Sequence, residues 1–186
     1  MLGVDLMGPF PKSVFVDYFS RWVELFPIRN ATAETISQIM VKDILTRWGI
    51  PDYILSDQGT QFVSSIFQTV CRTWNVGHKL TSAYHPHSNL AERVNRTLKT
   101  MIASYVGDDH KHWDKNLAEF RFAINSAVQE STDVSPAELN LGRSLRGPLD
   151  SMLQPQEIAP DTPPYLKVTQ LKDLFSFVEK NLDSAR

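Results

Sequence analysis

Residues 3–28 read GVDLMGPFPKSVFVDYFSRWVELFPI and contain three short apolar runs separated by turn-forming residues. The first run, Gly3–Met7, ends in a Gly-Pro pair that marks a turn. The next two, Val14–Phe19 and Trp22–Ile28, are rich in valine and phenylalanine, a composition typical of β-strands. We therefore expect three consecutive strands at the start of the chain.

The chain beyond residue 30 shows a different pattern, in which helices alternate with short strands. Thr32 has the side chain of a helix N-cap, and apolar residues then recur at helical spacing until Gly49 and Pro51. Ser64 or Ser65 opens a second helix. We expect short strands at residues 53–55 and 79–80, and longer helices at about 90–106 and 112–128. Strands followed by alternating strands and helices predict an α/β fold with a mixed sheet flanked by helices.

The composition excludes several classes of protein. The single cysteine, Cys71, rules out an internal disulfide and a cysteine-based zinc site. No apolar run approaches the roughly 18 residues of a membrane span, and no signal peptide is recognisable. We therefore expect an intracellular protein with no membrane partner. The 19 Lys and Arg residues against 21 Asp and Glu residues exclude a protein held on nucleic acid by bulk positive charge.

Proline content and charge predict how the chain is divided. Five of the 11 prolines fall between Pro148 and Pro164, which predicts an extended connector. Apolar residues at helical spacing follow it and predict an accessory helix, either docked or meant for a partner. We expect a main domain at residues 1–149, a proline-rich linker at 150–164 and the helix at 165–186. The last 37 residues, from position 150, hold six acidic and four basic residues, so the tail carries the whole net charge of −2.

Two aspartates are candidates for chemistry. Asp57 follows the apolar run YIL and precedes Gln58-Gly59, so it lies where an open α/β sheet places its ligands. Its side chain could instead form a local turn or cap the next helix. Asp5 lies inside an apolar run, and a buried carboxylate needs a partner or a metal. Asp5 could also face solvent, and Asp17 is a rival by the same reasoning.

The helix expected at residues 90–106 carries polar residues at helical spacing. Glu92, Asn95, Arg96 and Lys99 are predicted to share one face, with Val94, Leu98, Met101, Ile102 and Tyr105 on an apolar face. The polar face is either a solvated surface or a carboxylate aimed at a metal beside bases that hold phosphates. The histidines lack zinc-site spacing, and we expect surface or structural roles for them; they are His78, His85, His87, His110 and His112.

Several strings along the chain, taken together and in order, resemble the integrases of gypsy-type LTR retrotransposons. They cover roughly residues 3–149. The strings are Val4-Asp5-Leu6 with Gly8-Pro9, Val16-Asp17-Tyr18-Phe19-Ser20-Arg21, Gly49-Ile50-Pro51, Ser56-Asp57-Gln58-Gly59-Thr60-Gln61-Phe62, Ala83-Tyr84-His85-Pro86, Glu92-Arg93-Val94-Asn95-Arg96-Thr97-Leu98, and Ser135-Pro136-Ala137-Glu138-Leu139 with Leu141-Gly142-Arg143.

The resemblance implies a ribonuclease-H-like fold and a catalytic set of Asp5, Asp57 and Glu92 that holds two Mg²⁺ (or Mn²⁺) ions. It implies trimming of DNA ends and strand transfer into target DNA, in the nucleus, by a homodimer or higher oligomer. The host protein partner stays unknown. The residues that would contact DNA are Gln58, Gln61, His85, Asn95, Arg96 and Lys99.

Alternatives to a working integrase stay open. The first hairpin looks shorter than in these relatives, and we recognise none of the family's flanking modules. These features favour a retroelement-derived host protein that keeps the fold for interaction. A stand-alone ribonuclease-H-like nuclease is the third hypothesis. For self-association, the apolar stripe Trp113, Leu117, Phe120, Ile124 and Val128 is a candidate surface, although the same stripe could be core.

The charge is also unevenly distributed within the body. Residues 58–107 hold five bases and one acid, Glu92, a net of +4. This positive stretch contains most of the positions that the resemblance assigns to DNA. A near-neutral total therefore remains compatible with a site-specific DNA-binding protein.

Overall fold

The computed structural model describes residues 1–7, 12–81, 90–106, 114–153 and 164–184. By their contacts, these residues group into two compact units. The first unit comprises residues 1–19 and 23–121, and the second comprises 20–22 and 122–186. The predicted boundaries at residues 149 and 164 stay predictions. No helix in the described part of the chain is long and apolar enough to cross a membrane.

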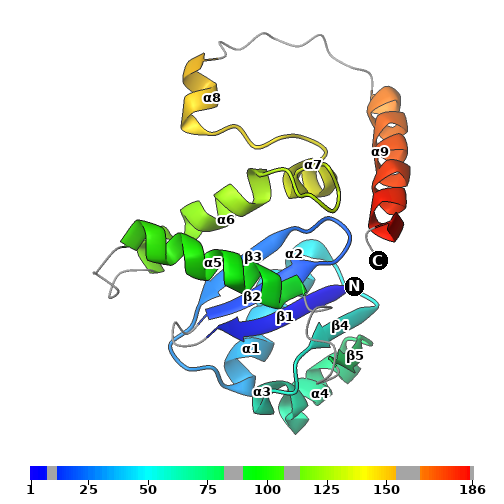
Figure 1. Ribbon diagram of the computed structural model, residues 1–186. Helices are drawn as coiled ribbons and strands as arrows, with labels where there is room; N and C mark the ends of the chain where they lie inside the picture. The colour runs from blue at the N-terminus through cyan, green and yellow to red at the C-terminus, as the bar shows by residue number, and fades with distance from the viewer. Residues whose placement is uncertain (8–11, 82–89, 107–113, 154–163, 185–186) are drawn as a thin grey trace. The chain divides into compact units, whose positions relative to one another are not determined.

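A five-stranded mixed sheet forms the centre of the first unit, with strand order β3-β2-β1-β4-β5 (Figure 1). The strands are β1 (Leu2–Met7), β2 (Lys12–Asp17), β3 (Val23–Pro27), β4 (Tyr53–Ser56) and β5 (Gly77–Leu80). The first three pair antiparallel, whereas β1 with β4 and β4 with β5 pair parallel. The prediction of an α/β fold with a mixed sheet is confirmed.

The first hairpin pairs along its whole length despite its short connection. All six residues of β1 have partners in β2, from Leu2 opposite Asp17 to Met7 opposite Lys12. This register places β2 two residues earlier than the predicted Val14–Phe19. The valine-rich composition located the strand, but pairing with β1 set its ends. The apparent shortening therefore leaves β1 paired on both sides, by β2 and β4.

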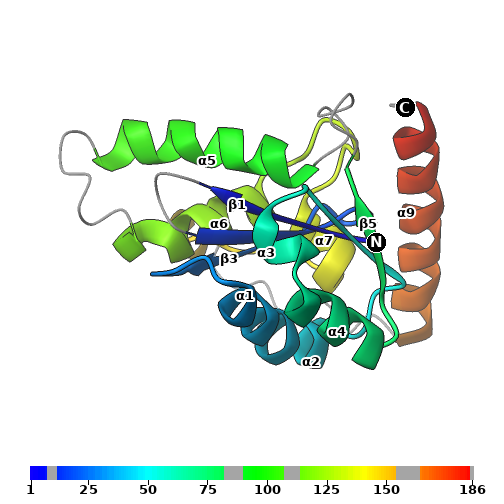
Figure 2. The same cartoon turned by 90° about the horizontal axis from the view of Figure 1, so that it is seen from below.

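Helices cover both faces of the sheet in the first unit (Figure 2). On one face, Val4 and Phe15 join a buried core with Ile36 of α1 (Ala33–Ile39) and Phe67 of α4 (Ser65–Thr73). On the other face, α5 (Leu90–Val106) packs against β1 and β2. Because side chains alternate along a strand, Asp5 lies on the α5 face while its neighbour Val4 lies in the core.

The helix predicted after Thr32 is divided by a π-helical segment. Thr32 caps α1 by accepting a hydrogen bond from the Thr35 N–H at 3.2 Å. The segment η1 (Met40–Leu45) follows, then α2 (Thr46–Trp48), and Gly49 ends the helix with φ +93°. The predicted cap and end are confirmed. The π-helical segment was not predicted, because the apolar spacing was compared only with the α-helical period.

The second predicted helix begins where expected. A short α3 (Thr60–Val63) precedes it, and Ser64 caps α4 by accepting from the Phe67 N–H at 3.2 Å. The short strand predicted at residues 79–80 extends from Gly77 to Leu80. These elements connect the Asp57 turn to the edge of the sheet.

The buried face of α5 differs from the prediction. Ala91, Leu98 and Ile102 are buried, and Asn95 lies among them at 4% exposed. Tyr105, predicted to be on the apolar face, is 71% exposed. The prediction that Asn95 shares one polar face with Glu92, Arg96 and Lys99 was therefore wrong, because Asn95 is buried and the other three are exposed. The helix is rotated so that Asn95 meets the sheet, because the buried Asp5 needs a hydrogen-bond donor there.

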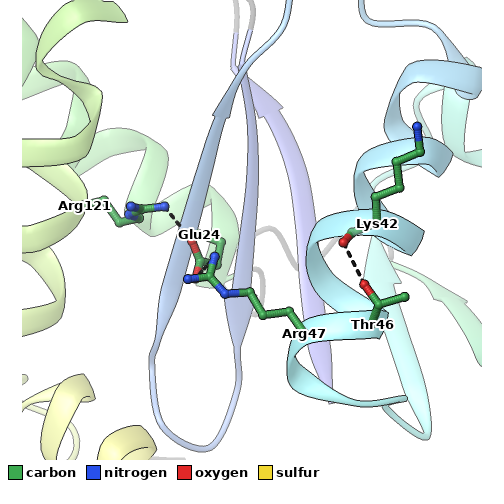
Figure 3. A network of polar contacts seen from close by, with 5 residues as sticks. All are labelled: Glu24, Lys42, Thr46, Arg47 and Arg121. Atoms are coloured by element: carbon green, nitrogen blue, oxygen red, sulfur yellow. Dashed lines mark hydrogen bonds and ion pairs between the residues drawn. The ribbon is translucent and has the colours of Figure 1, made fainter.

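A buried glutamate ties β3 to two helices. Glu24 is 3% exposed, and its Oε2 accepts from Arg121 Nη1 at 2.9 Å (Figure 3). Arg47 Nη1 lies 3.9 Å from Glu24 Oε1. Figure 3 also shows Thr46 donating to the Lys42 carbonyl, at 2.7 Å. The pairs offset the cost of burying the Glu24 carboxylate.

The second unit is helical. It contains α7 (Pro136–Leu141), α8 (Pro148–Leu153), α9 (Pro164–Ser184) and the second half of α6 (Leu117–Ser126). A capping box joins Ser135 and Glu138 at the start of α7. The predicted accessory helix is present as α9, and it is docked within the unit. Its Val178 is fully buried, and Asn181 Nδ2 donates to the Thr132 carbonyl at 3.3 Å.

Two predictions about the second half need correction. The proline-rich connector was expected to be extended, but its start is helical in α8, because Pro148 suits the first helical position.

The described part of the apolar stripe proposed for self-association is partly internal: Leu117, Phe120 and Ile124 are buried. Val128 is exposed, and Trp113 lies outside the described residues.

Candidate active site

Asp5 is the buried centre of the candidate site. It lies on β1 and is 8% exposed. Its Oδ1 accepts from the Leu6 N–H at 2.8 Å, and its Oδ2 accepts from Asn95 Nδ2 at 3.0 Å. The pKa of Asp5 is raised from 3.8 to about 6, chiefly by burial and to a smaller extent by the negative charges of Asp57 and Glu92. The two hydrogen bonds act in the opposite direction.

Asp57 follows β4 directly and is half-buried. Its Oδ1 accepts from the Gly59 N–H at 2.9 Å, so the local turn considered from sequence is present. A Cβ atom added to Gly59 would lie 3.0 Å from Asp57 Oδ1, tighter than most such contacts. Glycine therefore allows the backbone to approach the carboxylate. The turn and a position near Asp5 occur together rather than as alternatives.

Glu92 completes the group of carboxylates. It is exposed in the first turn of α5, and it lies close enough to raise the pKa of Asp5. One turn and one helix thus each supply a carboxylate whose charge acts on Asp5 of the strand. Even so, no three His, Cys, Asp or Glu side chains in the described segments are arranged to hold a metal ion. The residues 82–89 that precede α5 lie outside those segments, so a closed metal-binding triad stays a prediction.

The chemistry of these side chains fits a hard divalent cation. Mg²⁺ prefers oxygen ligands and is usually held by one or two carboxylates together with water and substrate phosphate. Mutual repulsion keeps nearby carboxylates apart, and a bound cation would offset it. Asn95 adds an independent observation, because its Oδ1 is buried and has no hydrogen-bond partner among the described residues. The site thus holds both an excess of negative charge and an unused oxygen acceptor.

The residues predicted to contact DNA fall into four groups. Arg96 and Lys99 are exposed on α5, one and two turns beyond Glu92, as the prediction requires. Gln58 and Gln61 are beside Asp57, where Gln58 Nε2 donates to the Thr81 carbonyl at 3.4 Å and Gln61 Oε1 accepts from Thr60. Asn95 is turned inward to Asp5. His85 lies outside the described residues.

The remaining sequence candidates are separate from this group. Asp17 is paired with Leu2 in the β1–β2 register, so it lies on the sheet face opposite to Asp5. Of the five histidines, His78 alone falls within the described residues, and it contacts Ser56 and Gln68. These contacts give it an internal structural role of the kind expected from the sequence.

The sequence indicated no role for one supporting residue and placed a second one wrongly. Tyr18 reaches across from the end of β2, and its hydroxyl oxygen accepts from the Leu90 N–H, the first of α5, at 3.2 Å. Asn95 was noticed but assigned to the wrong side of the helix. A signal existed for Asn95, since a carboxylate inside an apolar strand requires a buried donor. No pattern in the sequence indicated the role of Tyr18.

Comparison with known proteins shows which domain part of this chain resembles. Residues 7–86 match the integrase core domain. That segment contains Asp57 but not Asp5 or Glu92. The chain is also 36% identical over 140 residues to the Gag-Pol polyprotein of Walleye dermal sarcoma virus, covering 74% of this chain and 8% of that protein. It is 45% identical over 107 residues to the Pol polyprotein of Feline endogenous virus ECE1, covering 56% of this chain and 10% of that protein.

The solved structures most relevant here share the fold. A chain of the simian T-cell lymphotropic virus intasome in complex with PP2A regulatory subunit B56 gamma superposes with a TM-score of 0.65 at 24% identity. The match covers 88% of this chain and 58% of that chain. The HTLV-2 integrase catalytic core domain in complex with magnesium, in a trimeric form, gives 0.58 at 22% identity over 75% and 94% of the two chains.

These matches show that residues 7–86 are similar to the integrase core domain and that the fold is ribonuclease-H-like. The chain spans about a tenth or less of the length of the polyproteins named above. The region matched to integrase is thus one part of much longer relatives.

Proposed function

We propose that this chain is the catalytic core of a DNA integrase, a polynucleotidyl transferase that acts through Asp5, Asp57 and Glu92. The observation that carries the proposal is the Asp5 carboxylate, whose pKa is raised first by burial and then by two further carboxylates from separate elements. Burying and crowding negative charge is unfavourable unless the site binds a cation or a proton. Functional sites commonly show such perturbed groups. The match to the integrase core domain supports the same reaction class.

Asp5 and Asp57 are the residues best placed to hold Mg²⁺ or Mn²⁺, with Glu92 as the third ligand. When bound, the pair of ions would activate a water or a 3′-hydroxyl and stabilise the leaving oxygen in an in-line displacement. Asn95 holds Asp5 by one carboxylate oxygen and so limits its rotation. Glu92, at the exposed start of α5, remains free to turn toward the other two carboxylates.

DNA is the substrate that the surrounding charge favours. Arg96 and Lys99 are exposed on the helix that carries Glu92, so their cations can meet phosphates next to the reacting one. Gln58 and Gln61 follow Asp57 in the sequence, and their side-chain amides are available to hydrogen-bond the DNA strand being cut. We propose end processing and strand transfer as the reactions, in the nucleus, by a homodimer or larger assembly. A gypsy-type retroelement origin, with or without later use by a host, is part of this proposal.

Metal binding gives the first test. Mg²⁺ or Mn²⁺ at millimolar concentration should raise the melting temperature of the wild-type protein by mass action. Asp57→Asn should abolish that shift, while Asp52→Asn, which removes an exposed carboxylate before β4, should leave it intact. Activity is then measured as metal-dependent cleavage and joining of labelled DNA duplexes. No shift in the wild type, or an equal shift in Asp57→Asn, would contradict the proposed site.

A second candidate function is an integrase-derived interaction module without catalysis. It is favoured by the absence, among the described residues, of a closed set of three metal-ligating side chains. The two candidate functions differ in the metal dependence of DNA binding and in the joining of DNA ends. The module should bind DNA through Arg96 and Lys99 equally well with and without divalent metal, and it should join no ends.

A further inference from the structure

His78 lies beside β4, the strand that leads into Asp57, and both of its ring nitrogens have hydrogen-bond partners. It lies on β5, and its Nε2 is 2.8 Å from Ser56 Oγ. Its Nδ1 is 2.7 Å from Gln68 Nε2, on α4. The edge of the Phe67 ring packs against the imidazole, with the ring centroids 5.1 Å apart. Ser56 itself is fully buried at the end of β4.

The directions of these hydrogen bonds can be worked out atom by atom. The Ser56 hydroxyl has one proton, which it donates to the Asp57 carbonyl oxygen at 2.8 Å. His78 Nε2 must therefore carry a proton and donate it to Ser56 Oγ. Nδ1 must accept from the Gln68 amide, which also donates to the Phe62 carbonyl at 3.2 Å. The imidazole is thus neutral and held in a single tautomer, and burial lowers its pKa in agreement with this state.

This chain of bonds ends at the backbone of Asp57. On one side, Ser56 binds the Asp57 carbonyl, and on the other, the Gly59 N–H binds Asp57 Oδ1 at 2.9 Å. Between them, these contacts restrain both the main chain and the carboxylate of Asp57. The Ser56 carbonyl is also used, since it accepts from the Thr81 N–H at 2.8 Å beyond β5. The end of β4 is therefore held from its β5 side, remote from Asp5 and α5.

We propose that His78 is a positioning residue for Asp57: by donating to Ser56 it fixes the Asp57 peptide and aims the carboxylate at Asp5. The proposal deepens the proposed function, because it assigns to the β5 side of the sheet the orientation of one of the catalytic carboxylates. His78 does not touch the reacting atoms. Its effect passes through one buried hydroxyl, so it depends on a donor at the Nε2 position and not on the charge of the ring.

Two substitutions separate this role from simple packing. In His78→Gln, the new amide nitrogen reaches the position of Nε2 and can still donate to Ser56. In His78→Asn, the shorter side chain places its oxygen near the position of Nδ1, so the Gln68 contact survives and the Ser56 contact is lost. Both variants remove the ring from Phe67, and both should lower the melting temperature to a similar extent. Ser56→Ala removes the bond to Asp57 directly.

Hydrogen exchange of the Gly59 amide, followed by NMR, provides the test, because that amide is bonded to the Asp57 carboxylate. We expect exchange about five- to tenfold faster in His78→Asn and Ser56→Ala, the effect of losing one hydrogen bond. His78→Gln should exchange like the wild type. Equal Gly59 exchange in His78→Asn and His78→Gln, at matched melting temperatures, would overturn the proposal. So would an unchanged Gly59 amide in Ser56→Ala.

This readout needs neither metal nor DNA, so it is independent of the proposed function. If wild-type protein fails to bind Mn²⁺, the proposed active site is wrong, while the Gly59 result still decides the role of His78. If Mn²⁺ binds, its affinity for His78→Gln should be close to that for the wild type. Its affinity for His78→Asn should be lower, by about the same factor by which Gly59 exchange becomes faster. A reversed order would count against the positioning role.

Discussion

Asn95 Nδ2 on α5 donates a hydrogen bond to Asp5 Oδ2 on β1 at 3.0 Å, although 90 residues separate the two in the sequence. This bond joins the helix that carries Glu92 to the strand that carries Asp5. It also places the unpartnered Oδ1 of Asn95 beside a carboxyl group whose pKa is about 6. The two side chains therefore set how the candidate site responds to protons, metals and substitution.

Asp5→Asn should stabilise the protein at neutral pH. The folded pKa of Asp5 is raised from 3.8 to about 6, so the folded state binds more protons than the unfolded state in that window. The free energy of unfolding of the wild type therefore falls as the pH rises from about 4 to about 6. The loss is up to about 3 kcal/mol, at 1.36 kcal/mol per pKa unit. The substituted amide can donate to Asn95 Oδ1 after rotation of the Asn95 amide.

The measurement is urea unfolding of both proteins from pH 4 to pH 7.5. The difference in unfolding free energy should be small at pH 4 and grow in favour of Asp5→Asn above pH 6. Taking the difference removes groups common to both proteins, including Glu138, whose pKa is lowered by Ser135. A constant difference across this range would show that Asp5 is not perturbed.

Metal binding should depend on pH through the same group. The carboxylate form of Asp5 is the proposed ligand, so a cation would have to displace its proton when the pH lies below about 6. We expect the affinity for Mn²⁺ to fall steeply between pH 7 and pH 5, with a proton released on binding. Calorimetry in two buffers of different ionisation enthalpy measures that proton directly. An affinity that does not change over this range would argue against Asp5 as a ligand.

Asn95→Ala and Arg96→Ala should affect different properties although the residues are adjacent. Loss of Asn95 removes a hydrogen bond that lowers the pKa of Asp5, so the pKa should rise and Mn²⁺ binding should weaken at pH 6. Loss of Arg96 should leave the Asp5 pKa and Mn²⁺ binding unchanged and should weaken DNA binding. The slope of log affinity against log salt concentration should become smaller by about one. NMR titration of Asp5 and DNA binding at several salt concentrations test the pair. The assignment fails if Asn95→Ala leaves the Asp5 titration unaltered.

The two arginines beside Glu24 should contribute unequally to stability. Arg121→Ala leaves a buried carboxylate without its 2.9 Å partner, and we expect a cost of about 2–4 kcal/mol. Arg47 lies 3.9 Å away with its side chain 56% exposed, so Arg47→Ala should cost no more than about 1 kcal/mol. Chemical denaturation of the two variants is the comparison. Equal losses would mean that Glu24 is held mainly by other contacts.

Tyr18→Phe should loosen the start of α5. The phenol oxygen accepts from the Leu90 N–H, one of the helix donors without an internal partner, and its removal should cost about 1 kcal/mol. Gly3 leaves room for the Tyr18 ring, since an added Cβ would lie 2.8 Å from it. Gly3→Ala should therefore give a similar loss by displacing the ring. Hydrogen exchange in the first turn of α5 tests both variants, and unchanged rates in both would remove Tyr18 from this role.

Much of the fold could be predicted because its signals are local. Thr32 and Ser64 are capping residues whose side chains bond within three residues, and Gly49 adopts a positive φ that ends a helix. Strand ends and helix rotation depend on distant partners instead. The ends of β2 follow from pairing with β1, and the rotation of α5 follows from Asp5. Neither partner is visible in a short window of sequence.

The candidate site shows the same division. The sequence indicated an integrase-like chemistry through the order of its motifs. Two of these are Asp57 beside Gly59, and Glu92 followed by Arg96 and Lys99. The predicted arrangement of Asn95 was wrong, and the contribution of Tyr18 was missed. Both errors concern contacts between residues more than 70 positions apart, which no periodicity encodes.

The sequence by itself determined the α/β class, the capped helices and the residue types able to bind a cation and phosphates, because these follow from local pattern and side-chain chemistry. Tertiary structure alone decided that Asp5 is buried on the α5 face, that Asn95 turns inward to meet it, and that His78 supports Asp57 from the far side of β4. The physical reason is that pKa values and hydrogen-bond partners depend on burial and on charges brought together by folding.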